Sequence, residues 1–296
     1  MKVRKYAAID IGSNAIRLLI QNVIEAPDKP VQFFKNSLVR VPVRLGEESF
    51  AEGRISEQST RRIRQTLQAF LLLMEVNGVE KYRACATSAV REAQNGGQIL
   101  KEVGEQLGLE VEIIDGKTEA AIIAGTDLKK LIQQDKSYLY MDVGGGSTEF
   151  TLFSKGEVVS SRSFRIGTVR LLRKMVTEED WSALQTWIEK QAAVYPKLSI
   201  IGSGGNVNKL HRLSGRKREE PLSYIWLNAQ YHFLERLSYD ERISELGLNP
   251  DRADVILPAT QIFLLACKWS KAKKIHVPQI GLADGIIRDL YFREGE

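Results

Sequence analysis

The stretch SYLYMDVGGGSTEFTLFSK occupies residues 137–155, and KYAAIDIGSNAIRLLIQNV occupies residues 5–23. In both, an apolar run ends in Asp followed by Ile or Val and then Gly, passes through small and polar residues, and resumes as residues that favour β-strands. This order predicts a β-hairpin with an acidic residue beside its turn. The two acidic residues, Asp10 and Asp142, occupy equivalent positions. A duplicated hairpin predicts two similar domains, which we expect to face each other across a cleft.

The segments outside the two hairpins alternate between helix and strand patterns. Ser56 is typical of a helix N-cap, and Thr177 with Asp180 three residues later indicates a second capped helix. Alternation of this kind favours an α/β fold. The predicted strands lie at 82–86, 111–114, 199–205 and 274–278, the further predicted helices at 118–132, 224–237, 253–272 and 283–291, and a polar loop at 212–220.

The length indicates two domains, because 296 residues exceed the usual single-domain size of about 100 to 200. We expect an N-terminal domain of residues 1–124 plus about 282–296 and a C-terminal domain of residues 125–281. The last predicted helix would then pack back on the first domain. Apolar residues at 43% and charged residues at 27% are typical of a soluble globular protein and argue against disorder.

The net charge of +5 is spread along the chain, with one local cluster at Arg212, Arg216, Lys217 and Arg218. Such a cluster is either a solvated surface or a track for a polyanion. The sequence contains no helix-turn-helix, zinc-finger or aromatic-and-glycine RNA-binding signature. We therefore expect no nucleic-acid partner.

The two cysteines, Cys85 and Cys267, are far apart and give neither a disulfide framework nor metal-binding spacing. The N-terminus runs directly into a strand-like stretch, and no apolar run approaches the roughly 18 residues that span a bilayer. These features predict a cytoplasmic protein with no membrane partner.

Glycine-rich turns are the strongest functional signal. Three consecutive glycines at 144–146 let the backbone turn sharply and bring N–H groups close to a ligand, as a phosphate cradle requires. The alternative is an ordinary hairpin turn, which would not need Asp before the glycines and Ser-Thr-Glu after them. The turns at 12–14 and 204–205 are weaker signals by themselves. The phosphate-binding candidates in these turns are Gly12, Ser13, Asn14, Gly144, Gly145, Gly146, Ser147, Gly204 and Gly205.

Four carboxylates are candidates for the chemistry of phosphoanhydride hydrolysis. Asp10 and Asp142 would hold Mg²⁺ through their oxygens or through bound waters. The reaction also needs a positioned water and a carboxylate that accepts its proton, for which Glu119 and Glu149 are the candidates. Because Glu119 begins a predicted helix, capping and compensation of the helix dipole is its alternative role.

Two arginines are further candidates for phosphate binding. Arg17 follows the first glycine turn, and Arg91 lies in TSAVREA. Either would neutralise phosphate oxygens, because guanidinium offers bidentate donors. A surface salt bridge is the alternative for each.

Taken together, the motifs resemble the exopolyphosphatase/guanosine pentaphosphate phosphatase family of the actin-like superfamily. The resemblance covers nearly the whole chain and implies an α/β fold of two actin-like (ribonuclease H-like) domains, dependence on Mg²⁺, and a homodimer. It implies release of terminal phosphate from inorganic polyphosphate or guanosine pentaphosphate. The matching motifs, in family order, are AAIDIGSNAIRLLI, VRLGE, ATSAVREA, DGKTEAAIIAG, MDVGGGSTEF, RIGTVRLL, IGSGGNVNKL, LNPDRADVILPA and IGLADGII.

The resemblance also assigns roles to single residues. Glu119, in DGKTEA, matches the glutamate with which the family activates water, and Glu149 matches a second acid close to the reaction centre. The other matches are Asp10 to Asn14 in the first phosphate loop, Asp142 with Gly144 to Ser147 in the second, Arg17 and Arg91 near the phosphate path, and Arg252 and Asp254 in a motif of the second domain.

Some positions depart from the family pattern. Ala15 stands where many members have Ser, Thr118 where many have Glu, and Ala283 where an Arg or another polar residue is common. The loss of a cation at Ala283 would weaken the grip on a phosphate or a partner surface. The sequence also ends without the helical extension of longer members, which puts processive action on long chains in doubt.

Two alternatives share the expected fold. A sugar or acid kinase would transfer phosphate from ATP to a hydroxyl, but such kinases usually have Gly-x-Thr in the first loop and an aspartate base, whereas this chain has Ser13-Asn14 and Glu119. A nucleotide-switched filament or regulatory binding protein is the non-enzymatic alternative. The intact Glu119 and both loops argue against it, and fold alone does not decide between these functions.

Overall fold

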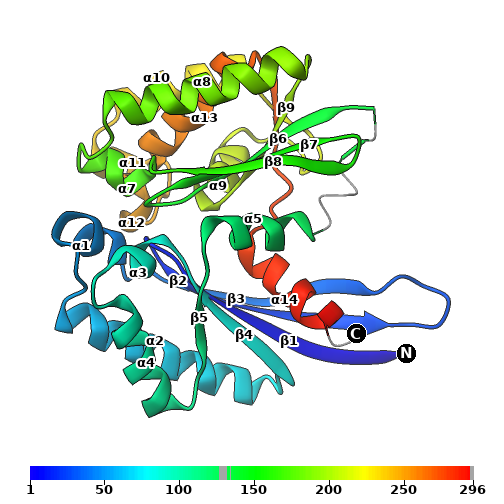
Figure 1. The fold of residues 1–296 in the computed structure, drawn as a ribbon, viewed down its shortest axis with the longest axis vertical. Helices are drawn as coiled ribbons and strands as arrows, with labels where there is room; N and C mark the ends of the chain where they lie inside the picture. Colours follow the sequence, from blue (N-terminus) through cyan, green and yellow to red (C-terminus); the bar gives the residue numbers. More distant parts are fainter. Residues whose placement is uncertain (127–131, 134, 294–296) are drawn as a thin grey trace. The chain divides into compact units, whose positions relative to one another are not determined.

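The computed structural model describes residues 1–126, 132–133 and 135–293. The chain forms two compact units, one of Met1–Thr126 with Leu282–Glu296 and the other of Asp127–Gly281. Each unit contains one mixed β-sheet with helices packed on it (Figure 1). The predicted class of two mixed α/β domains is thus confirmed. Within the described ranges, no helix has the length and apolar character needed to cross a membrane.

The first unit has a five-stranded sheet in the order β3-β2-β1-β4-β5. Strands β1, β2 and β3 pair antiparallel, and β4 and β5 continue the sheet parallel to β1. The predicted hairpin of residues 5–23 is therefore confirmed as β1 and β2. The strands are β1 (Lys2–Ile11), β2 (Ile16–Glu25), β3 (Gln32–Val41), β4 (Lys81–Ala86) and β5 (Val111–Ile113).

The second unit repeats this plan in a six-stranded sheet of order β10-β11-β9-β6-β7-β8. Its central strand β6 pairs antiparallel with β7 on one side and parallel with β9 on the other, as β1 pairs with β2 and β4. The predicted duplication is confirmed in register, because Asp10 pairs with Arg17 and Asp142 with Glu149, each one pair before the turn. The strands are β6 (Ser137–Val143), β7 (Thr148–Ser154), β8 (Glu157–Phe164), β9 (Ser199–Ser203), β10 (Leu222–Ser223) and β11 (Lys274–His276).

Helices cover both faces of the first sheet: α2 and α4 lie on one face, and α5 and α14 lie on the other (Figure 1). Ser56 caps α2 as predicted, because its side chain accepts a hydrogen bond from the Ser59 amide. In place of the helix predicted at 118–132, the structure has α5, which ends at Ala124. Residues 127–131 of the prediction lie outside the described residues. The helices are α1 (Leu45–Glu52), α2 (Glu57–Val76), α3 (Ser88–Glu92), α4 (Gly96–Leu107), α5 (Gly116–Ala124) and α14 (Leu282–Phe292).

The second unit buries a large apolar core between its sheet and helices. Thr177 and Asp180 form the predicted capping box at the start of α8. The single helix predicted at 253–272 is wrong, because α12 ends at Ala253 and α13 begins at Ile256. Pro258 fits the first turn of α13, where a missing N–H costs no hydrogen bond. The helices are α7 (Thr168–Leu172), α8 (Glu178–Val194), α9 (Gly205–Leu213), α10 (Tyr224–Arg236), α11 (Tyr239–Ser244), α12 (Pro250–Ala253) and α13 (Ile256–Ser270).

Candidate active site

The turn between β1 and β2 is closed by a hydrogen bond from the Gly12 amide to the Ala15 carbonyl oxygen at 3.1 Å. Within the turn, two carbonyl oxygens accept hydrogen bonds from the segment of residues 44–46. The Ser13 carbonyl accepts from the Gly46 amide at 2.8 Å, and the Asn14 carbonyl accepts from the Arg44 amide at 3.1 Å. In a trans peptide the N–H points opposite to the C=O. The amides of Asn14 and Ala15 therefore point away from residues 44–46.

Close packing explains the glycine at position 46 in the VRLGE motif. A Cβ atom on Gly46 would lie 2.7 Å from the Phe50 ring and 3.1 Å from the Ser13 Cβ. The Ser13 hydroxyl also hydrogen-bonds the Ser88 hydroxyl at 2.9 Å, and both side chains are buried. The first turn is thus fixed by two segments that are distant in sequence.

Asp10 and Arg17, predicted as a metal ligand and a phosphate-binding cation, contact each other. Arg17 Nη1 donates to Asp10 Oδ2 at 2.7 Å, across the β1–β2 pair. The Asp10 side chain is 4% exposed and that of Arg17 33% exposed. The aspartate is therefore held in place, while part of the guanidinium reaches solvent.

The parallel strands β1, β4 and β5 end at the same edge of the first sheet. The Thr87 amide donates to the Ile11 carbonyl oxygen at 3.1 Å, and the Ile114 amide to that of Ala86 at 3.0 Å. Ligand sites of open α/β sheets lie outside the carboxyl ends of the strands. The candidates Gly12, Ser13 and Asn14 therefore belong to the edge of the sheet that favours a ligand.

Helix α5 begins at the same edge, directly after β5. Its cap is Asp115, whose carboxylate accepts from the Thr118 amide at 2.7 Å; this hydrogen bond lowers the pKa of Asp115. Glu119 lies in the first turn of α5 and is 9% exposed. Arg91 Nη1 donates to the Ile114 carbonyl oxygen at 2.6 Å, so Arg91 fixes the entry to this helix. The structure therefore brings Arg91 close to the start of α5.

The turn between β6 and β7 is built like the first turn. The Gly144 amide donates to the Ser147 carbonyl oxygen at 3.0 Å. The carbonyl oxygens of residues 144 and 145 accept from the amides of Thr168 and Val169 at 3.0 and 2.9 Å. By the same trans-peptide geometry, the amides of Gly145 and Gly146 point away from the 167–170 segment. Both hairpins therefore present backbone donors on the side opposite to a supporting segment.

Two residues of the RIGTVRLL motif support the second turn from behind. Arg170, which is 3% exposed, donates from Nε to the Gly146 carbonyl oxygen at 2.7 Å. A Cβ atom on Gly167 would lie 2.3 Å from the Gly145 carbonyl oxygen, so only glycine allows this approach. Sequence reasoning missed both residues, although the motif that contains them was recognised.

Glu149 is buried beside the second turn, at 4% exposure. Its Oε1 accepts from the Ser147 hydroxyl at 2.6 Å and from the Ser163 hydroxyl at 3.1 Å. Hydrogen bonds from two hydroxyls fix the carboxylate. The structure therefore joins Ser147 and Glu149 directly, and adds Ser163 on β8, which carried no signal in the sequence.

The third glycine turn follows β9 and starts α9. Gly204 has a φ of 105°, a conformation that side-chain-bearing residues rarely adopt, and a Cβ atom on it would lie 3.3 Å from Asp142 Oδ1. Arg252 Nη1 donates to the Gly205 carbonyl oxygen at 2.9 Å. The predicted metal ligand Asp142 thus packs against this turn, and Arg252 supports it from behind.

The chain is similar to several phosphatases in sequence. It is 29% identical over 290 residues to the bifunctional 3-dehydroquinate synthase/phosphatase of Fusobacterium nucleatum, an alignment that covers 86% of this chain and 42% of that protein. The chain therefore spans less than half the length of that relative. It is 22% identical over 304 residues to exopolyphosphatase 1 of Mycobacterium tuberculosis, covering 96% of this chain and 87% of that protein.

The fold gives the same result as the sequence. The crystal structure of an exopolyphosphatase from Cytophaga hutchinsonii is similar with a TM-score of 0.83 and 25% sequence identity, over 99% of this chain and 98% of that chain. The sequence model of the Ppx/GppA phosphatase family matches residues 37–294 of this chain. The chain belongs to the Ppx/GppA phosphatase family, which confirms the resemblance of its motifs.

Proposed function

We propose that this chain removes the terminal phosphate from inorganic polyphosphate, from guanosine pentaphosphate, or from both. The observation that carries the proposal is the shared construction of the turns at 12–15 and 144–147, whose carbonyl oxygens are tied to a supporting segment. Backbone amides gathered on the other side are donors for phosphate oxygens. Family membership and the exopolyphosphatases among the relatives support the same substrate class.

In the proposed reaction, backbone amides of each turn hold phosphate oxygens of the substrate and Arg17 neutralises phosphate oxygens. Glu119 orients a water molecule and accepts its proton as the water oxygen attacks the terminal phosphorus. The bond from that phosphorus to the bridging oxygen breaks, and the shortened chain leaves with the bonding electrons. Positioning and electrostatic stabilisation supply most of the rate enhancement in phosphoryl transfer, which suits a site built from fixed backbone donors.

The carboxylates proposed for Mg²⁺ fit the preference of that ion for oxygen ligands. Mg²⁺ usually binds through one or two carboxylates together with waters and substrate phosphates, so a dedicated cage is not required. In the part of the chain that the structure describes, no three His, Cys, Asp or Glu side chains gather to hold a metal by themselves. We propose Asp142 and Asp10 as the ligands. When bound, the ion would neutralise charge on the phosphate oxygens.

The test is phosphate release in the presence of Mg²⁺ from short polyphosphate, long polyphosphate, guanosine pentaphosphate and ATP in parallel. Glu119→Gln keeps the size of the side chain and removes the proton acceptor, so we expect release to fall by at least about a hundredfold. Glu110→Gln makes the same charge change at an exposed position of the first unit and is the matched control.

Release that is lost in Glu119→Gln and kept in Glu110→Gln supports the hydrolase and ranks its substrates. Equal rates in Glu119→Gln and the parent would refute the role of Glu119. Binding of ATP or polyphosphate without any release would refute the hydrolase and favour a kinase or a binding protein.

A further inference from the structure

A hollow of about 430 Å³ lies in the second unit between the edge strand β8 and the helix α8. One of its lining residues is on β8, and the other five are spaced along α8 so that they share one side of the helix. The lining residues are Arg162, Ser182, Ala183, Thr186, Trp187 and Lys190.

The lining of the β8/α8 hollow is suited to an anion. It contains two cations, Arg162 and Lys190, and two hydroxyls, but no carboxylate. The guanidinium carbon of Arg162 lies 4.8 Å from the centre of the Phe164 ring. A guanidinium placed over an aromatic ring can still donate its N–H groups to an oxygen ligand.

The aromatic wall of the hollow is rigidly packed. The Trp187 ring centre lies 5.8 Å from that of Phe150 and 5.7 Å from that of Phe164, and the two phenylalanine rings are 5.7 Å apart. Trp187 remains half-buried and lines the hollow. The hollow therefore has a fixed wall and an indole that reports on its occupancy.

The hollow and the carboxylate of Glu149 lie on opposite faces of the second sheet. Arg162 on β8 pairs with Phe150 on β7, and the next pair along the strands is Ser163 with Glu149. Successive side chains of a strand point to opposite faces. Because the Ser163 hydroxyl donates to Glu149, the Arg162 side chain points to the other face. The hollow is thus separate from the carboxylate of Glu149 and from the Ser163 hydroxyl that contacts it.

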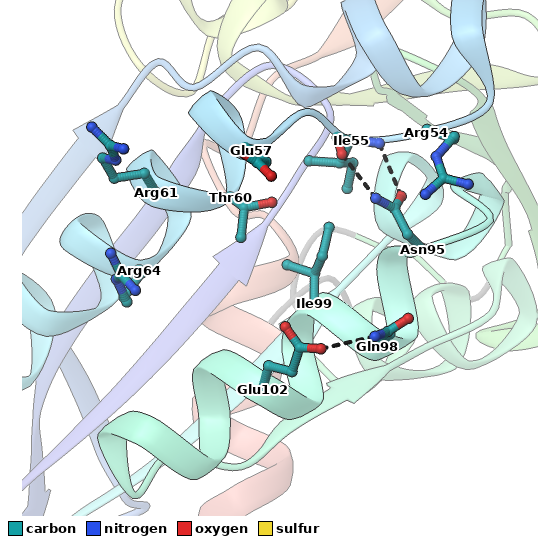
Figure 2. Close-up of a pocket in the computed structure, with 10 residues that line it drawn as sticks. All are labelled: Arg54, Ile55, Glu57, Thr60, Arg61, Arg64, Asn95, Gln98, Ile99 and Glu102. Atoms are coloured by element: carbon teal, nitrogen blue, oxygen red, sulfur yellow. Dashed lines mark hydrogen bonds between the residues drawn. The ribbon is translucent and has the colours of Figure 1, made fainter.

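A hollow of the first unit shows the contrast (Figure 2). It measures about 340 Å³ and is lined by Arg54, Arg61 and Arg64, but also by Glu57 and Glu102. Carboxylates beside arginines compete with an anionic ligand, so this hollow is the poorer anion site. It supplies a matched control, because two arginines can be neutralised there with the same change in net charge.

We propose that the β8/α8 hollow binds a chain of phosphate groups, with Arg162 and Lys190 neutralising its charge and Ser182 and Thr186 donating hydrogen bonds. These phosphate groups can belong to inorganic polyphosphate or to the 5′-polyphosphate of a nucleotide, whose base would stack on Trp187. Binding there involves no bond cleavage, so this proposal stands or falls independently of the proposed hydrolysis.

The test is a titration of tryptophan fluorescence and of binding heat with tripolyphosphate, guanosine triphosphate and sulfate, in EDTA to prevent turnover. We expect tripolyphosphate to change the fluorescence of the parent protein. In R162Q/K190Q the affinity of this site falls by at least about tenfold, because hydrogen bonds to charged groups are lost. Trp187→Phe removes the fluorescence change but keeps the binding heat, and R54Q/R61Q binds like the parent.

Tighter binding of guanosine triphosphate than of tripolyphosphate identifies a nucleotide as the source, and the reverse order identifies inorganic polyphosphate; both support the site. An unchanged affinity in R162Q/K190Q would overturn the proposal, as would a fluorescence change that persists in Trp187→Phe. Sulfate binding as tightly as tripolyphosphate would also overturn it, because a single anion would then fill the site.

Discussion

The buried guanidinium of Arg170 donates from Nε to the carbonyl oxygen of Gly146 at 2.7 Å. This contact joins the helix α7 to the glycine turn between β6 and β7, 24 residues earlier in the chain. It aligns one peptide of the turn so that the N–H of Ser147 points to the side opposite Arg170. The donors of this turn therefore depend on a side chain that lies behind it.

Replacement of Arg170 is the first prediction. Arg170→Ala leaves the Gly146 carbonyl without its donor and frees the peptide to rotate. We expect phosphate release to fall by at least about tenfold and the free energy of unfolding by about 1–3 kcal/mol. The measurement is kcat and KM for polyphosphate together with urea unfolding. Arg173→Ala, at an exposed position of the same segment, is the control and should change neither. An active Arg170→Ala would show that the turn holds its shape alone.

A methyl group on Gly167 is the second prediction. In Gly167→Ala the new Cβ would lie 2.3 Å from the Gly145 carbonyl oxygen, so the turn or α7 must move. We expect unfolding to become easier by at least about 1–3 kcal/mol and phosphate release to fall with it. Gly97→Ala is the control, because its Cβ meets only Ile113 Cδ1 at 3.9 Å, and this exposed change should alter the free energy of unfolding by less than about 0.5 kcal/mol. Similar melting temperatures for the two variants would contradict the close packing at Gly167.

These contacts mark the limit of what the sequence predicts. The two hairpins and the Thr177 cap were predictable because their signals lie within a few residues of each other: an apolar run that ends in Asp and a glycine turn, and a capping box. The hydrogen bond between Ser13 and Ser88 joins residues 75 positions apart, and no local sequence pattern predicts it. A single hydroxyl such as that of Ser163 reaches Glu149 only because of the register between β7 and β8. The motifs therefore predicted where the turns lie, but not the residues that hold them in place.

Anchoring of the last helix is the third prediction. Asp284 in the first turn of α14 accepts from Gln21 Nε2 at 2.9 Å and lies 3.1 Å from Lys35 Nζ, which ties the helix to β2 and β3. Asp284→Ala leaves the buried amide of Gln21 without this acceptor. We expect a loss of about 1–3 kcal/mol in the free energy of unfolding, most of it from Gln21, because the half-exposed Lys35 is screened by solvent.

The measurement for Asp284 is urea unfolding compared with Glu235→Ala, which removes an exposed partner of His232 and should cost less than about 0.5 kcal/mol. Asp284→Asn keeps an oxygen acceptor for Gln21 and should recover most of the loss. A full loss in Asp284→Asn would show instead that the charge pair with Lys35 dominates.

The fourth prediction concerns the two buried thiols. Burial raises the pKa of Cys85 to about 12 and that of Cys267 to about 12. Because the pKa of each thiol is higher in the folded than in the unfolded protein, the thiols stabilise the folded protein below about pH 9, where they are protonated in both. This contribution is lost as the pH rises towards 12, because the thiols of the unfolded protein ionise first.

We expect neither thiol to react with a disulfide reagent at pH 8 in the native protein, and both to react in urea. We also expect the free energy of unfolding to fall between pH 9 and 11, by less in C85A/C267A than in the parent. A native thiol that reacts at its unfolded rate would contradict the burial of that side chain.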